Sequence, residues 1–308
     1  MAKLTVGIVS NNRLYYLRAL VESFVACNGT DGFEFILVDN ASAEPGLQEY
    51  IRSLEFFTHR IVEPCSMATA LNRIIELASA DVILILPDDI QFVLRGVPWI
   101  EAGLNLLARH PQIGTITFDA QRRVTIRKYF GGWRVHLAKE YSDPATGLSV
   151  RSYGRQRPGI GGAGVNTFTR RAVWQRLGPW RTRKELETFM DSGVGAEADM
   201  LLRYRKNRMR LERCILPVPA AADILTDPGG FPAKVRGARR MGRYFAPPNA
   251  RFYYELIDPD QAARLRSIRP VPAFEDAIRP VGFPLPLDTH GNIIKGNPID
   301  GQTESLPV

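Results

Sequence analysis

Residues 82–92 read VILILPDDIQF, an apolar run that stops at a proline followed by two aspartates. A short continuous apolar run of this kind predicts a strand that is buried on both faces of a sheet. Two earlier runs, LTVGIV at residues 4–9 and FEFILV at residues 33–38, predict strands of the same type, and Ile61 with Val62 lies in a shorter one.

Apolar residues recur at helical spacing between these predicted strands. They form two sets: Leu14, Leu17, Val21, Phe24 and Val25, then Ala68, Leu71, Ile74, Ile75 and Ala78. The resulting β-α-β-α-β order predicts an α/β fold, Rossmann-like, with a mostly parallel central sheet flanked by helices on both faces. Ligands of such folds lie at the carboxyl ends of the strands.

The pattern becomes less regular after residue 90. A helix over residues 97–109 and a strand over residues 113–118 precede stretches that are rich in glycine, arginine and aromatic residues. Two further helices are predicted at residues 169–178 and 196–210, and Gly178 is placed to cap the first of them. We expect the second substrate to bind in this half of the chain.

Composition divides the chain into a domain and an extension. Proline becomes frequent past about residue 225, which leaves little room for long helices or central strands. The prediction is a domain over residues 1–225, with a first half over 1–95 and a second half over 96–225. A Pro-rich extension over 226–308 follows.

The bulk properties fit a globular protein. The chain has 308 residues, of which 45% are hydrophobic, and no apolar run approaches the roughly 20 residues of a membrane span. The first residues lack the pattern of a secretory signal, and three scattered cysteines have no metal-ligand spacing and form no disulfide framework. These features predict a soluble, cytoplasmic protein.

The formal net charge is +8, and basic residues gather at residues 203–213 and 234–243. Such segments attract anions, which include diphosphates, lipid headgroups and nucleic acid, although a solvated helix face gives the same pattern. Peripheral membrane contact and nucleic-acid contact are therefore partners to consider beside a small anionic substrate.

Two strands end in carboxylates. Asp39 follows the strand in ILVDNAS, where a carboxylate can accept hydrogen bonds from a base or ribose or can simply form a turn. Asp88 and Asp89 end the run ILILPDD, and adjacent carboxylates beside a diphosphate suit Mg²⁺ or Mn²⁺. An ordinary acidic turn is the alternative.

In their order and spacing these motifs resemble glycosyltransferase family 2, whose members have the GT-A fold. The resemblance covers roughly residues 3–220 and rests on GIVSNNRLYYL, LVDNAS, ALNRIIELASADVILILPDD, GGAGVNTFTRRAVWQRLGPW and AEADMLLRYRKNRMRL. It implies a divalent metal, Mn²⁺ or Mg²⁺, and a donor that is a nucleoside diphosphate sugar. By the same resemblance, residues 1–95 are the nucleotide-sugar-binding half of the domain and residues 96–225 are its acceptor-side half.

The resemblance assigns roles on the donor side residue by residue. Asp39 matches the nucleobase-contacting aspartate, and Asp89 matches the last acid of the metal-binding DxD motif. Pro87 stands where the first acid of that motif belongs, so that Asp88 is the residue that can substitute for it. The remaining donor-side residues implied by the resemblance are Asn11, Arg13, Asn72 and Arg73.

On the acceptor side, the resemblance makes Glu197 the general base, with Asp199 as the other candidate, although acids at a helix start are also favoured by the helix dipole. Asp223 is the side chain in CILPVPAAADIL that suits a further metal contact, although it could equally cap a helix or a turn. Trp133 and Trp180 could stack on sugar faces or belong to the core, and Gly162 lies in a glycine-rich acceptor-side loop.

The expected function is sugar transfer from the nucleotide to a glycan, lipid or protein acceptor, with inversion implied by the resemblance. Two alternatives stay open: an inactive nucleotide-sugar-binding module, because Pro87 replaces an acid, and a transferase that acts on nucleic acid, because the chain is basic.

Overall fold

The structure is a computed structural model. It describes residues 2–12, 14–121, 139–152, 166–182, 196, 199–200, 202–204 and 211–223. The predicted extension over residues 226–308 lies outside this part of the chain, and so do the predicted site residues Arg13, Trp133, Gly162 and Glu197.

The first half of the chain forms the predicted parallel sheet. Strands β1 (Leu4–Ser10), β2 (Phe33–Asp39), β3 (His59–Val62) and β4 (Val82–Pro87) lie in the order β3-β2-β1-β4, and all three of these pairings are parallel. Their carboxyl ends therefore meet at one edge. The register sets Ser10 beside Asp39 and Val9 beside Pro87.

Alternation along these strands explains the two faces of the sheet. In β4, Leu84 and Leu86 belong to one hydrophobic cluster, and Ile83 and Ile85 belong to the other. All four side chains are fully buried. Because burial of one such side chain contributes about 1.5–3 kcal/mol, this strand stabilises both layers at once.

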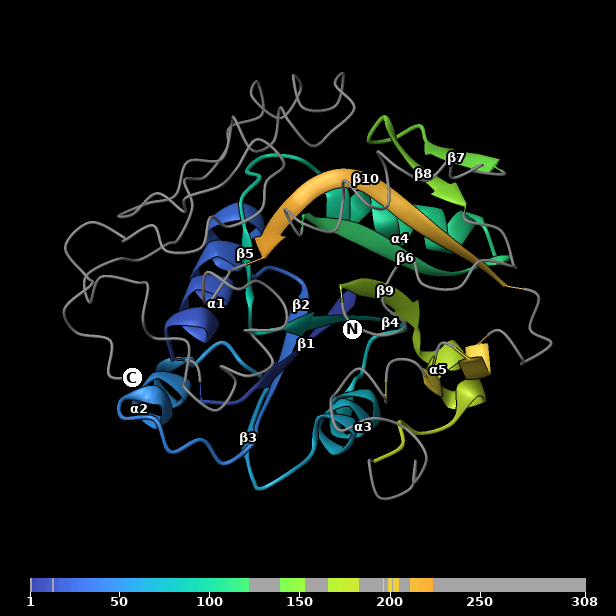
Figure 1. Cartoon of the computed structure of the whole chain (residues 1–308). Coiled ribbons are helices and arrows are strands. Elements are labelled where there is room, and N and C mark those ends of the chain that lie inside the picture. The colour runs from blue at the N-terminus through green and yellow to red at the C-terminus, as the bar shows by residue number, and fades with distance from the viewer. Residues whose placement is uncertain are drawn as a thin grey trace, which may run out of the picture.

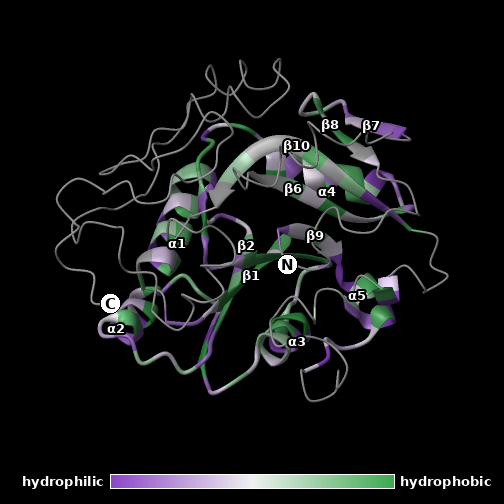
Figure 2. Ribbon diagram, viewed as in Figure 1, coloured by the Kyte–Doolittle hydropathy of each residue, from purple (hydrophilic) through white to green (hydrophobic). Residues whose placement is uncertain are grey.

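Helices cover both faces, as predicted. Figure 1 shows α1 (Leu14–Asn28) and α2 (Leu47–Ser53) to one side of the sheet and α3 (Met67–Leu77) and α5 (Arg171–Leu177) to the other. The clusters agree, because α1, α2 and α4 (Trp99–Arg109) pack in the first cluster and α3 and α5 in the second. Figure 2 shows the hydrophobic colouring of β1 and β4 between these layers.

Close packing of α3 on the sheet depends on Gly7 in β1. A Cβ atom at this position would lie 2.3 Å from Cγ2 of Ile74, a distance that real Cβ contacts do not reach. Glycine is therefore the residue that lets this helix approach the strand.

The second half of the chain extends the sheet through β9 (Thr167–Arg170). This strand lies antiparallel between β4 and β6 (Ile113–Gln121), and β6 pairs in parallel with β10 (Glu212–Asp223). Strand β5 (Ile90–Phe92) pairs with the end of β10. The long arc of β10 in Figure 1 therefore links the acidic turn after β4 to the far side of the sheet.

A hairpin completes the sheet at its far edge. Strands β7 (Lys139–Asp143) and β8 (Leu148–Ser152) pair antiparallel, and β8 joins β10. Figure 2 shows β7 as largely hydrophilic, in keeping with its sequence KEYSD.

Helix α5 ends where the sequence predicts, since Gly178 caps it with a positive φ of 80°. Of the helix predicted over residues 196–210, the described residues Ala196, Asp199, Met200 and 202–204 are helical. Within the described chain, no helix has both the length and the apolar character needed to cross a membrane.

Candidate functional site

The candidate site lies at the carboxyl edge of the parallel strands. Strand β1 has β2 on one side and β4 on the other. The chain runs from β1 through β2 to β3 and then returns past β1 to β4, so the strand order reverses between β1 and β4. Open α/β sheets bind ligands at such a switch point. The segments that meet there are the loop after β1, the loop after β2 and the acidic turn after β4.

The loops after β1 and β2 are joined by hydrogen bonds. Asn12, with φ of 52°, donates its backbone N–H to Ser42 Oγ at 2.7 Å, and its Oδ1 accepts from the N–H of Ala43 at 2.8 Å. The backbone N–H of Leu14 donates to Glu44 at 2.9 Å. Asparagine adopts this left-handed conformation more readily than most residues, which explains its presence at the turn.

Asp39 lies at the predicted place, at the end of β2, and is fully buried. Its carboxylate accepts hydrogen bonds from the N–H and Oγ of Ser42 and from Gln48 Nε2 at 3.3 Å. A carboxylate offers about four acceptor positions, and three are filled here. Because Asp39 is also fully buried, a nucleobase can reach its remaining acceptor position only if a covering group such as Gln48 or Ser42 moves.

Cys65 lies close to this carboxylate. Its backbone N–H donates to Asn40 Oδ1 at 2.8 Å. Burial, together with the negative charges of Glu63 and Asp39, raises the pKa of the Cys65 thiol, so that the thiol stays protonated at neutral pH.

The acidic turn connects β4 to β5. Asp88 and Asp89 are each only 7% exposed, and Asp88 Oδ2 accepts from the backbone N–H of Asn11 at 3.5 Å. Adjacent carboxylates at this burial repel each other unless a cation or donors stabilise them, and hard oxygen ligands suit Mg²⁺ or Mn²⁺. The donor set therefore fits a divalent cation.

The register brings Asp223 to the same turn. Asp223 in β10 pairs with Ile90, the residue after Asp89, although its side chain is outside the described part. Among the described side chains, no group of three or more His, Cys, Asp or Glu residues gathers at one point. The pairing of β10 with β5 therefore makes Asp223 a candidate for the further metal ligand.

The structure gives Asn72 and Arg73 other partners. The amide of Asn72 donates to the carbonyl of Trp180 at 2.9 Å and accepts from its N–H at 2.7 Å. Arg73 forms an exposed ion pair with Glu76 at 2.8 Å. In this arrangement Asn72 joins α3 to the segment after α5, and Arg73 pairs with a residue of its own helix.

The predicted sugar-stacking role of Trp180 is corrected by its position. The side chain is 1% exposed and its ring lies 5.6 Å from that of Trp174 in the hydrophobic cluster beneath α3 and α5. A sugar cannot stack on a ring that the core covers. Trp180 is therefore a core residue, which is the alternative that its apolar area also allows.

Asp199, the second candidate base, is held by two arginines. Its carboxylate accepts from Arg203 at 2.8 Å and lies 3.6 Å from Arg181. Arg203 also donates to the carbonyl of Leu177. This network ties the helix at residue 199 to the end of α5. Glu197, the first candidate base, lies outside the described residues.

Sequence reasoning missed two residues that flank the acidic turn. Ser10 is 1% exposed and Asn166 is 8% exposed, and among the described residues the buried Ser10 Oγ and Asn166 Oδ1 atoms have no hydrogen-bond partner. Leaving a buried polar atom unsatisfied costs about 1–3 kcal/mol, so such atoms call for a functional explanation. Isolated Ser and Asn residues give no sequence signal of burial.

Comparison with known proteins identifies the family. The model of glycosyl transferase family 2 matches residues 5–163, just over half of the 308-residue chain. The chain belongs to this family. No curated protein matches the sequence.

Solved structures agree with the fold of this family 2 domain. The mannosyltransferase PcManGT from Pyrobaculum calidifontis, in complex with GDP-Man and Mn²⁺, aligns with a TM-score of 0.51 at 16% identity. The alignment covers 89% of this chain and 67% of that one. At this identity the likeness concerns the fold.

Two structures of TarS from S. aureus are also similar. The first aligns with a TM-score of 0.49 at 12% identity, over 73% of this chain and 37% of TarS. TarS 1-349 in complex with UDP-GlcNAc aligns at 0.46 and 11% identity, over 71% and 58%. The family 2 chain therefore spans little more than a third of the length of the first TarS structure.

Proposed function

We propose that the chain transfers a sugar from a nucleoside diphosphate sugar to a hydroxyl group of a glycan, lipid or protein acceptor. The observation that carries this proposal is the buried pair Asp88–Asp89, at the switch point of a family 2 sheet and beside the loops after β1 and β2. The mannosyltransferase with the same fold was solved with a nucleotide sugar and Mn²⁺, which supports the choice of donor class and metal.

The roles of the residues follow from the order of the strands. Asp39 lies at the end of β2 and is the proposed nucleobase contact, once Gln48 or Ser42 releases it. Asp88 and Asp89, with Asp223 in register beside them, would hold Mn²⁺ or Mg²⁺. The bound cation supplies Lewis-acid stabilisation of the leaving diphosphate.

The transfer step needs one base. Glu197 accepts the proton of the acceptor hydroxyl as its oxygen attacks the anomeric carbon, while the bond from that carbon to the diphosphate oxygen breaks. The products are the glycosylated acceptor and a nucleoside diphosphate. Attack from the face opposite the nucleotide inverts the anomeric centre.

Thermal melting with nucleotides tests the donor site. Uridine, guanosine, thymidine and cytidine diphosphates are each added with Mn²⁺, with Mg²⁺ or with a chelator. Binding to the folded state at a hundredfold excess over Kd stabilises it by about 2.7 kcal/mol, so one nucleotide should raise Tm only with metal present. Asp89→Ala should remove that shift, whereas Asp31→Ala, an exposed change, should keep it. No shift with any nucleotide would overturn the proposal.

A second candidate is a binding module without activity, and Pro87 in place of an acid favours it. Slow release of nucleoside diphosphate from the donor separates the two, because an active transferase also transfers the sugar to water. Equal release by the wild type and Asp89→Ala, with nucleotide binding retained by the wild type, would favour the binding module.

A further inference from the structure

The buried side-chain amide of Asn166, beside the acidic turn, is a candidate for binding the donor sugar. Asn166 precedes β9, and its backbone N–H donates to the carbonyl of Ile85 at 2.7 Å, while its own carbonyl accepts from the N–H of Phe118 at 3.2 Å. The backbone is therefore fixed between β4 and β6. The side chain is nine-tenths buried, yet no hydrogen bond from the described part of the chain holds its Oδ1.

The position of Asn166 along the sheet edge indicates which part of a ligand it meets. Thr167 pairs with Ile85 in antiparallel register, which sets Asn166 opposite Leu86, just before the acidic turn. Along the edge, the order is Asp39 on β2, Ser10 on β1, Asp88 after β4 and then Asn166 before β9. Neighbouring strands lie about 4.8 Å apart, so Asn166 is one step beyond the acidic turn, on the side away from Asp39.

A nucleoside diphosphate sugar is linear, with the base at one end, the diphosphate in the middle and the sugar at the other end. If Asp39 takes the base and Asp88 with Asp89 the diphosphate, the sugar extends toward β9. We propose that Asn166 binds a hydroxyl group of the donor sugar through its side-chain amide. This inference rests on the proposed function, and it adds a residue that determines recognition of the sugar.

The conformation of Asn166 fits this role. Its φ is 57°, in the left-handed region that asparagine tolerates. The amide can turn about χ2 to present either its oxygen or its nitrogen, because no partner fixes Oδ1, and it can thus accept from or donate to a hydroxyl. The covered oxygen reaches the sugar by this rotation.

The test compares binding of the bare nucleotide with binding of the nucleotide sugar. Asn166→Gly removes the amide and keeps the positive φ without strain, and Asn105→Ala is the matched control because its amide donates to Asp143 on the far hairpin. Dissociation constants are measured with Mn²⁺ for UDP and UDP-GlcNAc, GDP and GDP-mannose, dTDP and dTDP-glucose, and CDP and CDP-glucose.

Asn166→Gly should bind the preferred nucleotide sugar about tenfold more weakly than the wild type, while its affinity for the bare diphosphate stays unchanged. Its Tm without nucleotide should not fall, because the removed amide oxygen had no partner. Asn105→Ala should lower Tm and leave both affinities unchanged.

Other results would overturn the inference. Equal loss of both affinities, or no loss of either, would exclude a contact with the sugar. A lower Tm without any sugar-specific loss would make Asn166 a structural residue. If the wild type bound no nucleotide at all, the proposed function would fail together with this inference. If the wild type bound the diphosphate but Asn166→Gly showed no sugar-specific loss, only this inference would fail.

Discussion

The proposed function gives different roles to two neighbouring acidic residues. Asp199 is fixed by Arg203 and Arg181, whereas Glu197 is the proposed general base. Loss of a general base lowers the rate by about 10²–10⁴. Glu197→Gln should therefore lose donor turnover by this factor and keep its Tm and its affinity for the nucleotide.

Asp199→Asn is the paired variant. It should lower Tm, because two guanidinium groups lose their charged partner, and it should keep most of the turnover. The measurements are the rate of nucleoside diphosphate release and the melting curve of each variant. The opposite outcome, an inactive Asp199→Asn with normal Tm, would move the base to Asp199.

Asn72 was predicted to face the nucleotide, and its contacts support a different prediction. Asn72→Ala leaves the backbone N–H and carbonyl of Trp180 without this partner in a partly buried place. Each unsatisfied group costs about 1–3 kcal/mol, so the variant should unfold at clearly lower urea concentration. Its affinity for a nucleoside diphosphate should match that of the wild type. A normal midpoint with weak nucleotide binding would restore the donor-site role.

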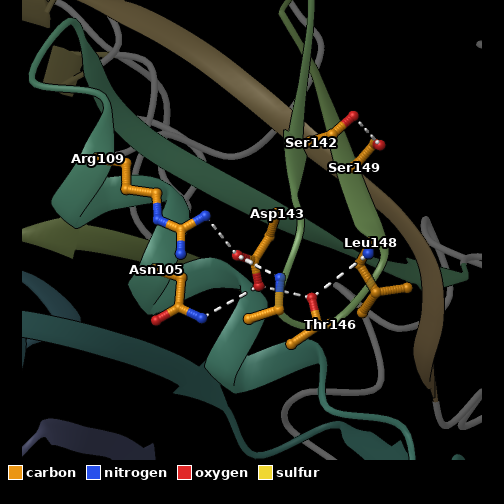
Figure 3. A network of polar contacts seen from close by, with 8 residues as sticks. Asn105, Arg109, Ser142, Asp143, Thr146, Leu148 and Ser149 are labelled. Carbon is orange, nitrogen blue, oxygen red and sulfur yellow. Dashed lines mark hydrogen bonds and ion pairs between the residues drawn. The ribbon is translucent and has the colours of Figure 1, made fainter.

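At the scale of single elements, a polar contact that the sequence does not predict fixes the β7–β8 hairpin to helix α4. Figure 3 shows Asp143, at the start of the turn between β7 and β8, joined to Asn105 and Arg109 of α4 at 3.1 and 3.2 Å. Thr146 donates to the same carboxylate at 2.7 Å and fixes the turn. The carboxylate therefore fastens the hairpin to the helix.

The environment of Asp143 makes the hairpin sensitive to acid. Burial alone would raise the pKa of this carboxyl, but the hydrogen bonds from Thr146, Asn105 and the N–H of Ala145, with the charge of Arg109, outweigh burial and lower it. A group whose folded pKa lies below its unfolded value stabilises the fold above the unfolded value, about 3.9 for Asp. This contribution is lost as the pH falls through the folded value.

Asp143→Asn should therefore cost about 1–3 kcal/mol in free energy of unfolding at pH 7, and the difference from the wild type should shrink below about pH 4. Urea unfolding at pH 7, 5 and 3 measures both quantities. Asp31→Asn, an exposed change, is the control and should follow the wild type at every pH. A cost that stays constant with pH would show that the charge of Asp143 plays no part.

At the scale of the whole molecule, sequence patterns predict the strands that are buried on both faces. Strands β1, β2 and β4 follow from apolar runs, and the helices between them from spacing. Strand β10 was not predicted, because Pro217 and Pro219 interrupt its sequence. A register shift between Leu216 and Ala221 accommodates these prolines in the structure. The polar strand β7 was not predicted either, because only one of its faces is covered and its sequence therefore lacks an apolar run.

The candidate site was predictable to the same extent. Asp39, Asp88 and Asp89 follow from strands that end in acids, and the structure places them at one edge of the sheet. The partners of Asn72 and the burial of Asn166 depend on contacts between segments that are far apart in the sequence, and the Asn72–Trp180 pair spans 108 positions. No local pattern encodes such contacts.

The central place of β10 also bears on where the folding unit ends. This strand comes last among the described elements but lies between β6 and β8, and it buries Cys214, Leu216, Ala220 and Ala221 in the core. A chain cut before β10 would leave β6 with an open edge and the β7–β8 hairpin without its partner in the sheet. The unit therefore has to extend to at least Asp223.

Because β10 completes the sheet, we expect residues 1–225 to fold without residues 226–308. The fragment should unfold in one transition, with a Tm within about 4 °C of the full chain, which corresponds to a change of roughly 1–2 kcal/mol. A fragment of residues 1–205, which lacks β10, should show no cooperative transition, since the edge of β6 and the apolar residues that pack on β10 become exposed. Circular dichroism melting of the two fragments beside the full chain measures this. An unfolded 1–225 fragment would place the boundary beyond residue 225 and would make residues 226–308 part of the folding unit.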